Sequence, residues 1–477
     1  MEPKIADGLR AIVGDRGLTT NATRRATYES DGLAHVRQVP DLVLMPRDTR
    51  ETAAALRFLK EWNVPIVPRG AGTGLSGGAT PVAGGVLIST ARMRDVIEVD
   101  SVNRFARVQA GVVNVDLTHA CADHGLFYAP DPSSQKACTI GGNVAENSGG
   151  PHCFKYGSTT QHVLGLVFVT IDGEIIDLAE PCVDPLGLDL VGVFVGSEGL
   201  LGIATEVTVR LLPVPPVVET LLAIFDDLDS ACDSVTDMIA ARLEMSAIEI
   251  LDKHTIDAIE ASVLAAGYPQ NAQAVLLLEC EGSDVEVAAA LRDIEPILAR
   301  HGAYDIRRAR AADERARLWA GRKGAYGAMG RIAPDLYVTD AVVPRTRLRE
   351  LVRATTDICE KRGLKVANVF HAGDGNLHPN ICYDRRDKDE LARVLDAGDE
   401  IMRVCLAAGG SLTGEHGVGL EKIEGMEWLF SHDDLAAMCR VREAFDPKRR
   451  MNPGKLLPMR ACMETRSAVR PNEPRNG

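Results

Sequence analysis

The sequence predicts a protein of mixed α+β class with more than one domain. The chain has 477 residues, enough for two or three domains with buried cores. Strand-like, helix-like and strand-like segments run in order through residues 42–68 and end in a glycine-rich stretch, which is typical of α/β units. After residues 213–216, a Pro-Val-Pro-Pro linker, strand-like and helical segments alternate again. This second pattern predicts a sheet backed by helices.

The first part of the chain is expected to contain short strands and few helices. Residues 1–37 read as a helical lead-in, and residues 49–62 as an amphipathic helix with Thr49 as its cap. Strands are expected at residues 42–45, 64–68, 86–89, 95–99, 105–110 and 204–212.

The stiff linker at residues 213–216 is the best candidate for a domain boundary. Beyond it we expect strands at residues 219–225 and 274–281, and helices at residues 228–242 and 284–301. The polar tail is expected to be disordered. The expected domains are therefore a lead-in at 1–37, a first domain at 38–216, a second at 217–457 and a tail at 458–477.

Composition excludes several classes of protein. The chain carries 53 basic and 67 acidic residues, a net charge of -14, which argues against nucleic-acid binding. Its 11 cysteines include no C-x-x-C spacing, which favours a reducing, cytoplasmic compartment and argues against an iron–sulfur cluster in this chain. No apolar signal core and no run of 18 apolar residues is present, so no transmembrane segment is expected.

The segment His371-Ala-Gly-Asp-Gly-Asn-Leu-His378 predicts a hairpin that carries two histidines. Asp374-Gly375 is a typical two-residue type I′ turn. In that register His371 faces His378, with Cβ atoms about 5 Å apart. Two imidazoles at that distance can bind one metal ion. The alternative is an ordinary surface turn with hydrogen-bonded histidines.

A second polar pair, Glu415-His416, lies in the glycine-rich segment 414–419. Two histidines and one glutamate make an open metal site that leaves a position for substrate. The remaining histidine could then serve as a base. Glycines on both sides allow unusual backbone angles, which suits a site and equally suits a plain loop.

The string Gly72-Thr-Gly74-Leu-Ser-Gly77 matches G-x-G-x-x-G, but a nicotinamide-binding reading is rejected. That fingerprint needs a helix to start at the motif, and the glycines and proline at residues 78–85 prevent one. Consecutive backbone N–H groups can still close on an anion. Tight turns alone would explain one such loop, but further glycine-rich segments at residues 139–151 and 195–203 favour phosphate binding.

Several motifs together resemble those of FAD-linked oxidoreductases of the vanillyl-alcohol oxidase type: residues 68–78, 130–134, 140–143, 195–199 and 452–455. The second half looks like the branch that includes the glycolate oxidase flavoprotein subunit, D-lactate dehydrogenases and D-2-hydroxyglutarate dehydrogenase. The likeness covers residues 38–457, and the motifs occur in the family's order.

This resemblance implies an α+β fold with a two-subdomain FAD-binding domain at residues 38–216 and a ferredoxin-like cap domain at 217–457. It implies FAD and a divalent metal (Zn, Mn or Fe) as cofactors. The residues implied for FAD binding are Pro68, Arg69, Gly70, Ala71, Gly72, Thr73, Gly74, Leu75, Ser76, Gly77, Pro130, Asp131, Ser133, Ser134, Gly141, Gly142, Asn143, Ala145, Gly149, Gly199, Ile203 and Asn452.

The resemblance also implies roles in oxidation of a small D-2-hydroxy acid to the 2-keto acid, with hydride passing to flavin N5. His371, His378 and Glu415 match the metal ligands, and His416 matches the base. Arg322 matches the arginine that binds the substrate carboxylate. Without the resemblance, an exposed helix arginine would be the simpler reading.

The sequence departs from the hydroxyglutarate enzymes at two positions. Val338 stands where they have a lysine for the distal carboxylate, and Tyr326 where they have a small hydroxyl residue. The valine puts a dicarboxylate substrate in doubt and favours a shorter acid of the glycolate or D-lactate type. Residues 319–326 and the strand at Asp340 look closest to the glycolate oxidase subunit.

Two other functions are open: an FAD-binding electron-transfer subunit of a complex, and a metallohydrolase. Because the chain has no cysteines spaced for an iron–sulfur cluster, the group that receives the electrons from the flavin is not assigned. An iron–sulfur or electron-transfer flavoprotein partner is therefore expected, and through it the chain could be peripheral at a membrane.

Overall fold

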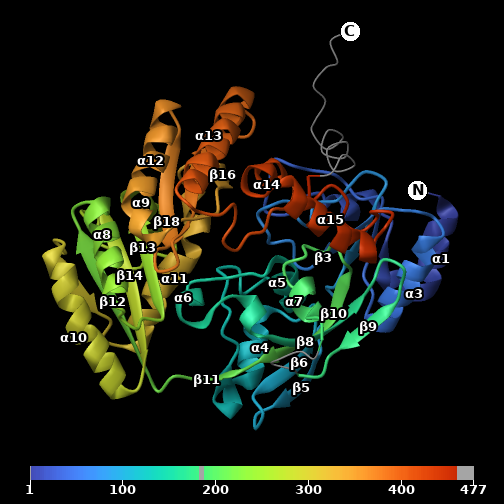
Figure 1. Cartoon of the computed structure of the whole chain (residues 1–477), viewed down its shortest axis with the longest axis horizontal. Helices are drawn as coiled ribbons and strands as arrows, with labels where there is room; N and C mark the ends of the chain where they lie inside the picture. The colour runs from blue at the N-terminus through green and yellow to red at the C-terminus, as the bar shows by residue number, and fades with distance from the viewer. Residues whose placement is uncertain (1, 182–186, 459–477) are drawn as a thin grey trace. The chain divides into compact units, whose positions relative to one another are not determined.

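The computed structural model describes residues 2–181 and 187–458. Its residues pack into two compact units (Figure 1). Unit 1 comprises Met1–Ser148, Ser158–Pro213 and Glu415–Gly477, and unit 2 comprises Gly149–Gly157 and Val214–Gly414. Both units mix helices and strands, which confirms the expected α+β class. The domain boundaries expected from the sequence stay a prediction, and the tail beyond residue 458 lies outside the described residues.

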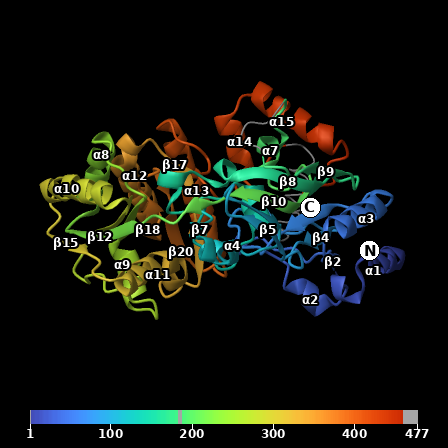
Figure 2. The same cartoon turned by 90° about the horizontal axis from the view of Figure 1, so that it is seen from below.

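Unit 1 is built on two main sheets. In the first, of order β1-β2-β4-β3, the strands β2 and β3 run parallel to β4. The second is antiparallel, of order β5-β6-β10-β8-β9, and its neighbouring strands β8 and β10 lie side by side in Figure 2. The strands of unit 1 are β1 Leu18–Thr19, β2 Leu42–Leu44, β3 Ile66–Arg69, β4 Val86–Ser89, β5 Val96–Asp100, β6 Phe105–Gln109, β7 Leu126–Phe127, β8 Val163–Val169, β9 Ile175–Leu178, β10 Ile203–Arg210 and β11 Leu212–Pro213.

Helices α1 and α3 pack on the first sheet through apolar side chains such as Leu9, Leu56 and Ile88. The cap of α3 differs from the expectation, because the Asp48 carboxylate, not Thr49, accepts the backbone N–H of Glu51. The helices of unit 1 are α1 Pro3–Val13, α2 Ala22–Ala26, α3 Thr49–Lys60, α4 Asn114–Cys121, α5 Ile140–Glu146, α7 Leu190–Phe194, α14 Ile423–Leu429 and α15 His432–Phe445, with short 3-10 turns η1 Asp15–Gly17, η2 Ala122–His124 and η3 Thr159–Gln161.

Unit 2 contains one large sheet whose central strands run in the order β15-β12-β14-β13-β18-β19-β17. Beyond β13, β18 pairs with both β19 and β20, and β20 pairs in turn with β16. The strands are β12 Val217–Phe225, β13 Ala247–Asp252, β14 Ala274–Gly282, β15 Asp305–Arg308, β16 Asp335–Val338, β17 Ala341–Val342, β18 Lys365–His371, β19 Asn376–Leu377 and β20 Pro379–Tyr383.

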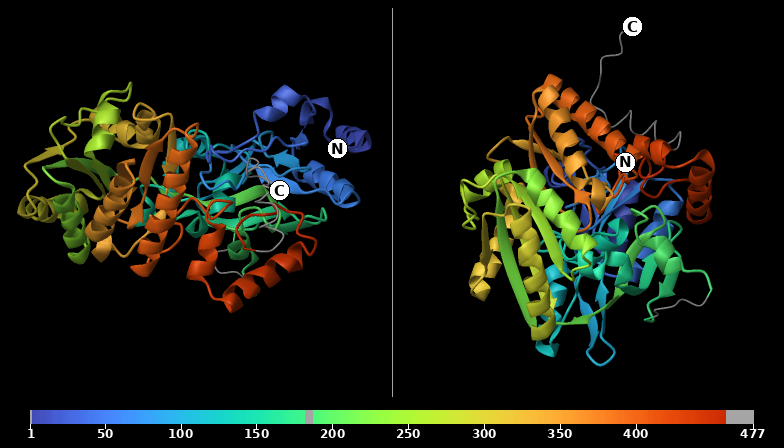
Figure 3. Two further views of the ribbon diagram at one scale, coloured as in Figure 1. Left: turned by 90° about the horizontal axis from the view of Figure 1, so that it is seen from above. Right: turned by 60° about the vertical axis from the view of Figure 1, so that its left-hand side comes forward.

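Helices α8 and α10 lie against strands β12 and β14 (Figures 1 and 3). Helix α10 begins with a capping box made by Ser283 and Glu286, which fixes its start at Asp284. The helices of unit 2 are α6 Cys153–Tyr156, α8 Leu228–Ala240, α9 Lys253–Glu260, α10 Asp284–Arg300, α11 Ala312–Met329, α12 Leu348–Lys361 and α13 Lys388–Ala407, with the 3-10 turn η4 Arg345–Arg347. Among the described residues, no helix has the length and apolarity to cross a bilayer.

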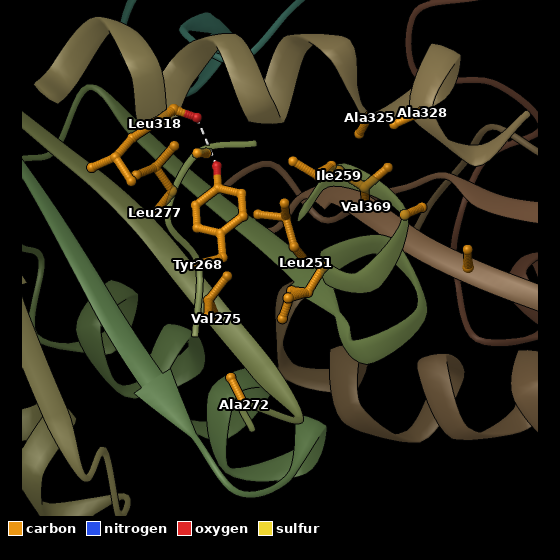
Figure 4. Packing of buried hydrophobic residues seen from close by; sticks show 14 of the residues in the cluster. Leu251, Ile259, Tyr268, Ala272, Val275, Leu277, Leu318, Ala325, Ala328 and Val369 are labelled. Atoms are coloured by element: carbon orange, nitrogen blue, oxygen red, sulfur yellow. Dashed lines mark hydrogen bonds between the residues drawn. The ribbon is translucent and has the colours of Figure 1, made fainter. Parts of the chain in front are cut away.

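Helices α9 and α11 pack on alternate residues of the sheet and form the core of unit 2 (Figure 4). Leu251, Leu277 and Val369 come from three neighbouring strands and point to these helices. Tyr268 lies among them, and its hydroxyl donates a 2.6 Å hydrogen bond to the Leu318 carbonyl. A polar side chain that points to this face of the sheet must therefore find a hydrogen-bond partner on α9, on α11 or on a neighbouring strand.

Tyr268→Phe should lower the free energy of unfolding by about 1–3 kcal/mol, because it removes a buried hydrogen bond without changing the ring. Urea denaturation followed by circular dichroism would measure the change. Tyr304→Phe is the matched control, since Tyr304 is exposed and should change stability by less than about 0.5 kcal/mol. Equal effects of the two substitutions would contradict the assignment of Tyr268 to the core.

Candidate functional site

The histidine hairpin forms, but in a different register from the expected one. His371 pairs with Asn376, so the loop between the strands has four residues, 372–375, and the expected direct pairing of His371 with His378 is wrong. A type I′ turn needs positive φ at both central residues. Gly375 has φ 72, whereas Asp374 does not adopt positive φ. The loop instead closes with a hydrogen bond from the Gly375 N–H to the Ala372 carbonyl.

The two imidazoles nevertheless lie side by side. His378 stands two positions beyond Asn376 and is therefore a diagonal neighbour of His371 on one face of the hairpin. Their ring centroids are 5.1 Å apart at an interplanar angle of 89°. Both side chains are buried, so they are not part of an ordinary surface turn. The structure thus brings the two predicted histidines together as diagonal neighbours, and not as the directly opposed pair that the turn rule predicted.

A buried carboxylate, Glu249, lies beside the first histidine. Glu249 sits on β13 directly opposite His371, and its Oε1 lies 2.7 Å from His371 Nδ1. Its Oε2 accepts hydrogen bonds of 2.6 and 2.5 Å from Nε and Nη2 of Arg322 on α11. Burial alone would raise the pKa of Glu249, but Arg322 and His371 together lower it below the usual carboxylate value. Glu249 is therefore an anion compensated by two groups that the sequence had singled out.

Arg322 is only 4% exposed. The simpler reading, an exposed helix arginine, is therefore wrong. Among the described residues, the guanidinium contacts Glu249 and approaches His371 Nδ1 to 3.4 Å. A buried guanidinium held on one edge can present its other edge to a carboxylate.

A second buried carboxylate, Asp340, lies beside the other histidine. Its Oδ1 is 3.7 Å from His378 Nδ1. Its Oδ2 accepts hydrogen bonds from the Thr413 hydroxyl at 2.5 Å and from the Gly414 N–H at 3.1 Å. Asp340 thereby fixes the segment that leads directly into Glu415.

This arrangement suits a divalent cation. Each imidazole has a carboxylate next to its Nδ1, Glu249 for His371 and Asp340 for His378. The 2.7 Å contact with Glu249 favours a proton on His371 Nδ1, which leaves Nε2 of His371 with the lone pair that can bind a metal. The 3.7 Å contact of Asp340 with His378 is longer than a hydrogen bond and places a negative charge nearby. Two buried imidazoles are donors that zinc, manganese or iron accepts.

Asn376 is a further polar residue that the sequence reading missed. It is buried, pairs directly with His371, and its Oδ1 has no hydrogen-bond partner among the described residues. A Cβ on Gly414 would overlap the Asn376 amide, so the amide lies against the backbone just before Glu415. Its position between the two histidines of segment 371–378 could have identified Asn376 from the sequence.

Glu415 and His416 follow Gly414 and begin the last segment of unit 1. Both side chains are mostly buried, at 14% and 16% exposed. The loop that follows is fixed within unit 1 by Glu198, whose carboxylate accepts the N–H groups of Val418 and Gly419 at 2.7 Å each. The predicted glutamate and histidine thus stand at the start of a rigid loop.

The three glycine-rich segments meet in unit 1. The Gly196 N–H donates to the Val144 carbonyl and the Glu198 N–H to the Ala145 carbonyl, which joins the third segment to the second. A Cβ on Gly199 would collide with Pro68, and one on Gly70 would approach Thr139 Oγ1 to 2.5 Å. The first segment therefore packs closely on both others. Such close backbone approach is what glycine permits.

The C-terminal motif ties these segments together. Asn452 Nδ2 donates to the carbonyls of Gly78 and Glu198, and Lys455 Nζ donates to those of Gly78 and Thr80. Burial lowers the pKa of Lys455 to about 7, against the opposing effect of nearby carboxylates. Asn452, which the sequence assigned to cofactor binding, thus also supports the loops through its own hydrogen bonds.

Buried polar atoms in each of the three segments lack a protein partner. Among the described residues, Ser76 Oγ, Asn143 Nδ2 and Ser197 Oγ make no hydrogen bond. A Cβ on Gly74 would meet no atom within 4 Å. Unsatisfied buried polar atoms beside open space point to a polar ligand, and glycine loops suit its phosphate groups. Ser197 was missed, although it lies inside the third glycine-rich segment.

The other residues expected to bind FAD are placed as follows. Arg69 donates to the Ser30 carbonyl at 2.8 Å, so its guanidinium is held by the protein backbone. Pro130 accepts a hydrogen bond from Asn114, and Asp131 beside it is buried. Gly149 belongs to unit 2, whereas the remaining ones belong to unit 1: Gly70, Ala71, Gly72, Thr73, Gly74, Leu75, Ser76, Gly77, Ser133, Ser134, Gly141, Gly142, Asn143, Ala145, Gly199, Ile203 and Asn452.

Comparison with known protein families gives two matches. Residues 40–179 match the FAD binding domain, and residues 214–456 match the C-terminal domain of FAD linked oxidases. Among curated proteins, the glycolate oxidase subunit GlcD of Escherichia coli K12 is 46% identical over 438 residues, covering 92% of this chain and 88% of that protein. The GlcD subunit of Bacillus subtilis is 40% identical, covering 95% and 96%.

A probable mitochondrial D-lactate dehydrogenase of Danio rerio is 31% identical, covering 95% of this chain and 92% of that protein. Among solved structures, 4-ethylphenol oxidase from Gulosibacter chungangensis superposes with a TM-score of 0.81 at 17% identity, covering 96% of this chain and 97% of that one. p-Cresol methylhydroxylase gives the same TM-score at 15% identity, covering 95% and 96%. These matches confirm the expected FAD-binding fold of the vanillyl-alcohol oxidase type with its C-terminal domain.

Gly74→Val should give a folded protein that lacks flavin. A Cβ at Gly74 would meet no protein atom within 4 Å, so the apoprotein should tolerate the side chain, whereas FAD bound at this loop would collide with it. Flavin absorbance per mole of purified protein measures the loss, and circular dichroism checks the fold. Gly72→Val is the contrast, because a Cβ there collides with Arg69 at φ +74 and should destabilise the fold itself. Full flavin occupancy in Gly74→Val would show that this loop does not contact FAD.

Proposed function

Because this chain belongs to the FAD-linked oxidases, we propose that it is an FAD-dependent dehydrogenase that oxidises a small D-2-hydroxy acid to the 2-keto acid. The observation that carries the proposal is the buried cluster of His371, His378, Glu249 and Arg322. The two imidazoles can bind a metal cation, and the Arg322 guanidinium can bind a carboxylate. A 2-hydroxy acid has a hydroxyl group that a metal cation can bind and a carboxylate that the guanidinium can bind. The names of the relatives, glycolate oxidase subunit and D-lactate dehydrogenase, support this substrate class.

The proposed reaction would use two cofactors. FAD, when bound, supplies the acceptor for the hydride from the substrate Cα, and a divalent cation supplies the charge that makes the substrate hydroxyl more acidic. His371 and His378 would hold the cation together with Glu415. Support for Glu415 comes from the chain itself, since it directly follows Gly414, which Asp340 holds beside His378.

Arg322 would bind the substrate carboxylate. Its Nε and Nη2 are engaged by Glu249, whereas Nη1 donates no hydrogen bond to any described residue. Two parallel N–H groups on that outer edge match the two oxygens of a carboxylate. Binding at Arg322 would orient the hydroxyl carbon relative to the histidine pair.

His416 would accept the hydroxyl proton. An imidazole with an ordinary pKa of about 6.5 can take up a proton near neutral pH. Support for this role comes from its place next to Glu415 and from the tether through Glu198, which limits movement of the loop that follows. A fixed base needs no reorganisation at the moment of proton transfer.

The proposed substrate is a short acid. Val338, which stands where the hydroxyglutarate branch has a lysine, is buried on β16 and pairs with Asn380. A buried valine offers nothing to a second carboxylate. Glycolate and D-lactate both meet this requirement.

The electrons would leave through a partner. The curated relatives of highest identity given above are named as subunits, which supports an iron–sulfur or electron-transfer flavoprotein partner in the cytoplasm or at a membrane surface. The other function considered, a chain that only transfers electrons, predicts no bleaching of the isolated flavoprotein by any 2-hydroxy acid.

His416→Asn should retain FAD and bind substrate, yet reduce its flavin about 10²–10⁴-fold more slowly than the wild type, the usual contribution of a positioned base. Anaerobic stopped-flow bleaching with glycolate and D-lactate measures the rate. His432→Asn is the control, because His432 is fully exposed and should behave as wild type. Near wild-type bleaching by His416→Asn would assign proton removal to another group, and no bleaching of the wild type would overturn the proposed reaction.

Protein purified without chelator should contain a divalent cation that His378→Ala loses. Removal of one imidazole ligand weakens the site by loss of a metal–nitrogen bond. Elemental analysis measures the content, and His301→Ala, whose histidine pairs with Asp237 on the surface, is the control that should keep it. Unchanged turnover after exhaustive chelation would show that no cation takes part.

A further inference from the structure

Glu249 is placed where an apolar residue would normally stand. It lies on β13 within Ala247-Ile-Glu-Ile-Leu, on the face of the sheet that packs against α9 and α11. Its side chain is fully buried. An unpaired charge at such a position costs several kcal/mol, so the contacts of Glu249 are the reason it can be there.

The two carboxylate oxygens serve two different groups. Oε1 lies 2.7 Å from Nδ1 of His371, and Oε2 is bound by Nε and Nη2 of Arg322. When His371 Nδ1 is protonated, it donates a hydrogen bond to Glu249, and Nε2 keeps its lone pair. One side chain therefore determines both which nitrogen His371 offers and where the Arg322 guanidinium stands.

We propose that Glu249 is a positioning residue that couples cation binding at His371 to substrate binding at Arg322. This inference rests on the proposed function. Since one carboxylate holds both groups, it fixes where the His371 imidazole and the Arg322 guanidinium stand relative to each other.

The same sheet contains a matched carboxylate, Glu279, whose hydrogen bonds among the described residues go to groups other than His371 and His378. Glu279 on β14 is also buried on the α11 face and accepts hydrogen bonds from Trp319 at 2.6 Å and Thr220 at 2.9 Å. It also lies 2.9 Å from Nε2 of a histidine, His152. Loss of charge at Glu279 should disturb the fold to a similar degree without reaching the cation.

The experiment compares Glu249→Gln with Glu279→Gln as flavin-loaded proteins. Each is loaded with Zn²⁺ and titrated with a competing chelator, and protein-bound zinc is measured by elemental analysis. Glu249→Gln should bind zinc about 10–100-fold more weakly than the wild type, the usual effect of removing the hydrogen-bond partner of a metal-binding histidine. Glu279→Gln should match the wild type. Glu249→Gln should also raise KM for the 2-hydroxy acid, because Arg322 loses its anchor.

The outcomes separate this inference from the proposed function. If the wild type binds no zinc and turns over after chelation, the metal-assisted function fails. If the wild type binds zinc and Glu249→Gln binds it equally well, the function stands and the role of Glu249 is overturned. Should Glu249→Gln not fold, Glu249→Asp retains the charge near Arg322 but is too short to reach His371 as well. It should weaken zinc binding, and wild-type affinity in that variant would equally overturn the inference.

Discussion

The buried polar cluster of unit 2 depends on compensation of one charge, that of Glu249. Glu249 stands in a layer filled mainly by apolar side chains. Loss of Arg322 or His371 would leave its charge only partly compensated, and breaking a buried ion pair typically costs about 3–5 kcal/mol. Any arrangement that moved Arg322 or His371 away from Glu249 would therefore make the fold less stable. A helix, α11, and two strands, β13 and β18, must be correctly packed before these three groups can meet.

The main feature of unit 1 is the close approach of backbone segments to one another. Its glycine-rich segments contact one another with almost no side chains between them, and the Ser76 carbonyl accepts N–H groups from both Leu420 and Glu421. The loop after His416 is therefore part of the same framework as the glycine-rich segments. Gly417 and Gly419 permit this, since a Cβ on either would collide with Glu146 or Ser76.

The strands and helices followed from periodicity, and the family followed from motifs spread along the chain. The hairpin register did not follow, because Asp-Gly fits more than one turn and the pairing of β18 with β20 decides between them. Asp48 displaced Thr49 as the cap of α3 because both residue types can cap. Glu249 was overlooked because partners distant in sequence, Arg322 and His371, explain it only in three dimensions.

The edge of the first sheet is completed by the far end of the chain. The Ile66 N–H donates to the Arg450 carbonyl, and the Asn452 N–H donates to the Ile66 carbonyl, so residues 450–452 pair beside β3. During synthesis from the N-terminus, this edge of β3 stays open until residues 450–452 have been made. An unpaired apolar strand edge invites association with other chains. The nascent protein therefore depends on protection of the β3 edge from the synthesis of residues 66–69 until that of residues 450–452.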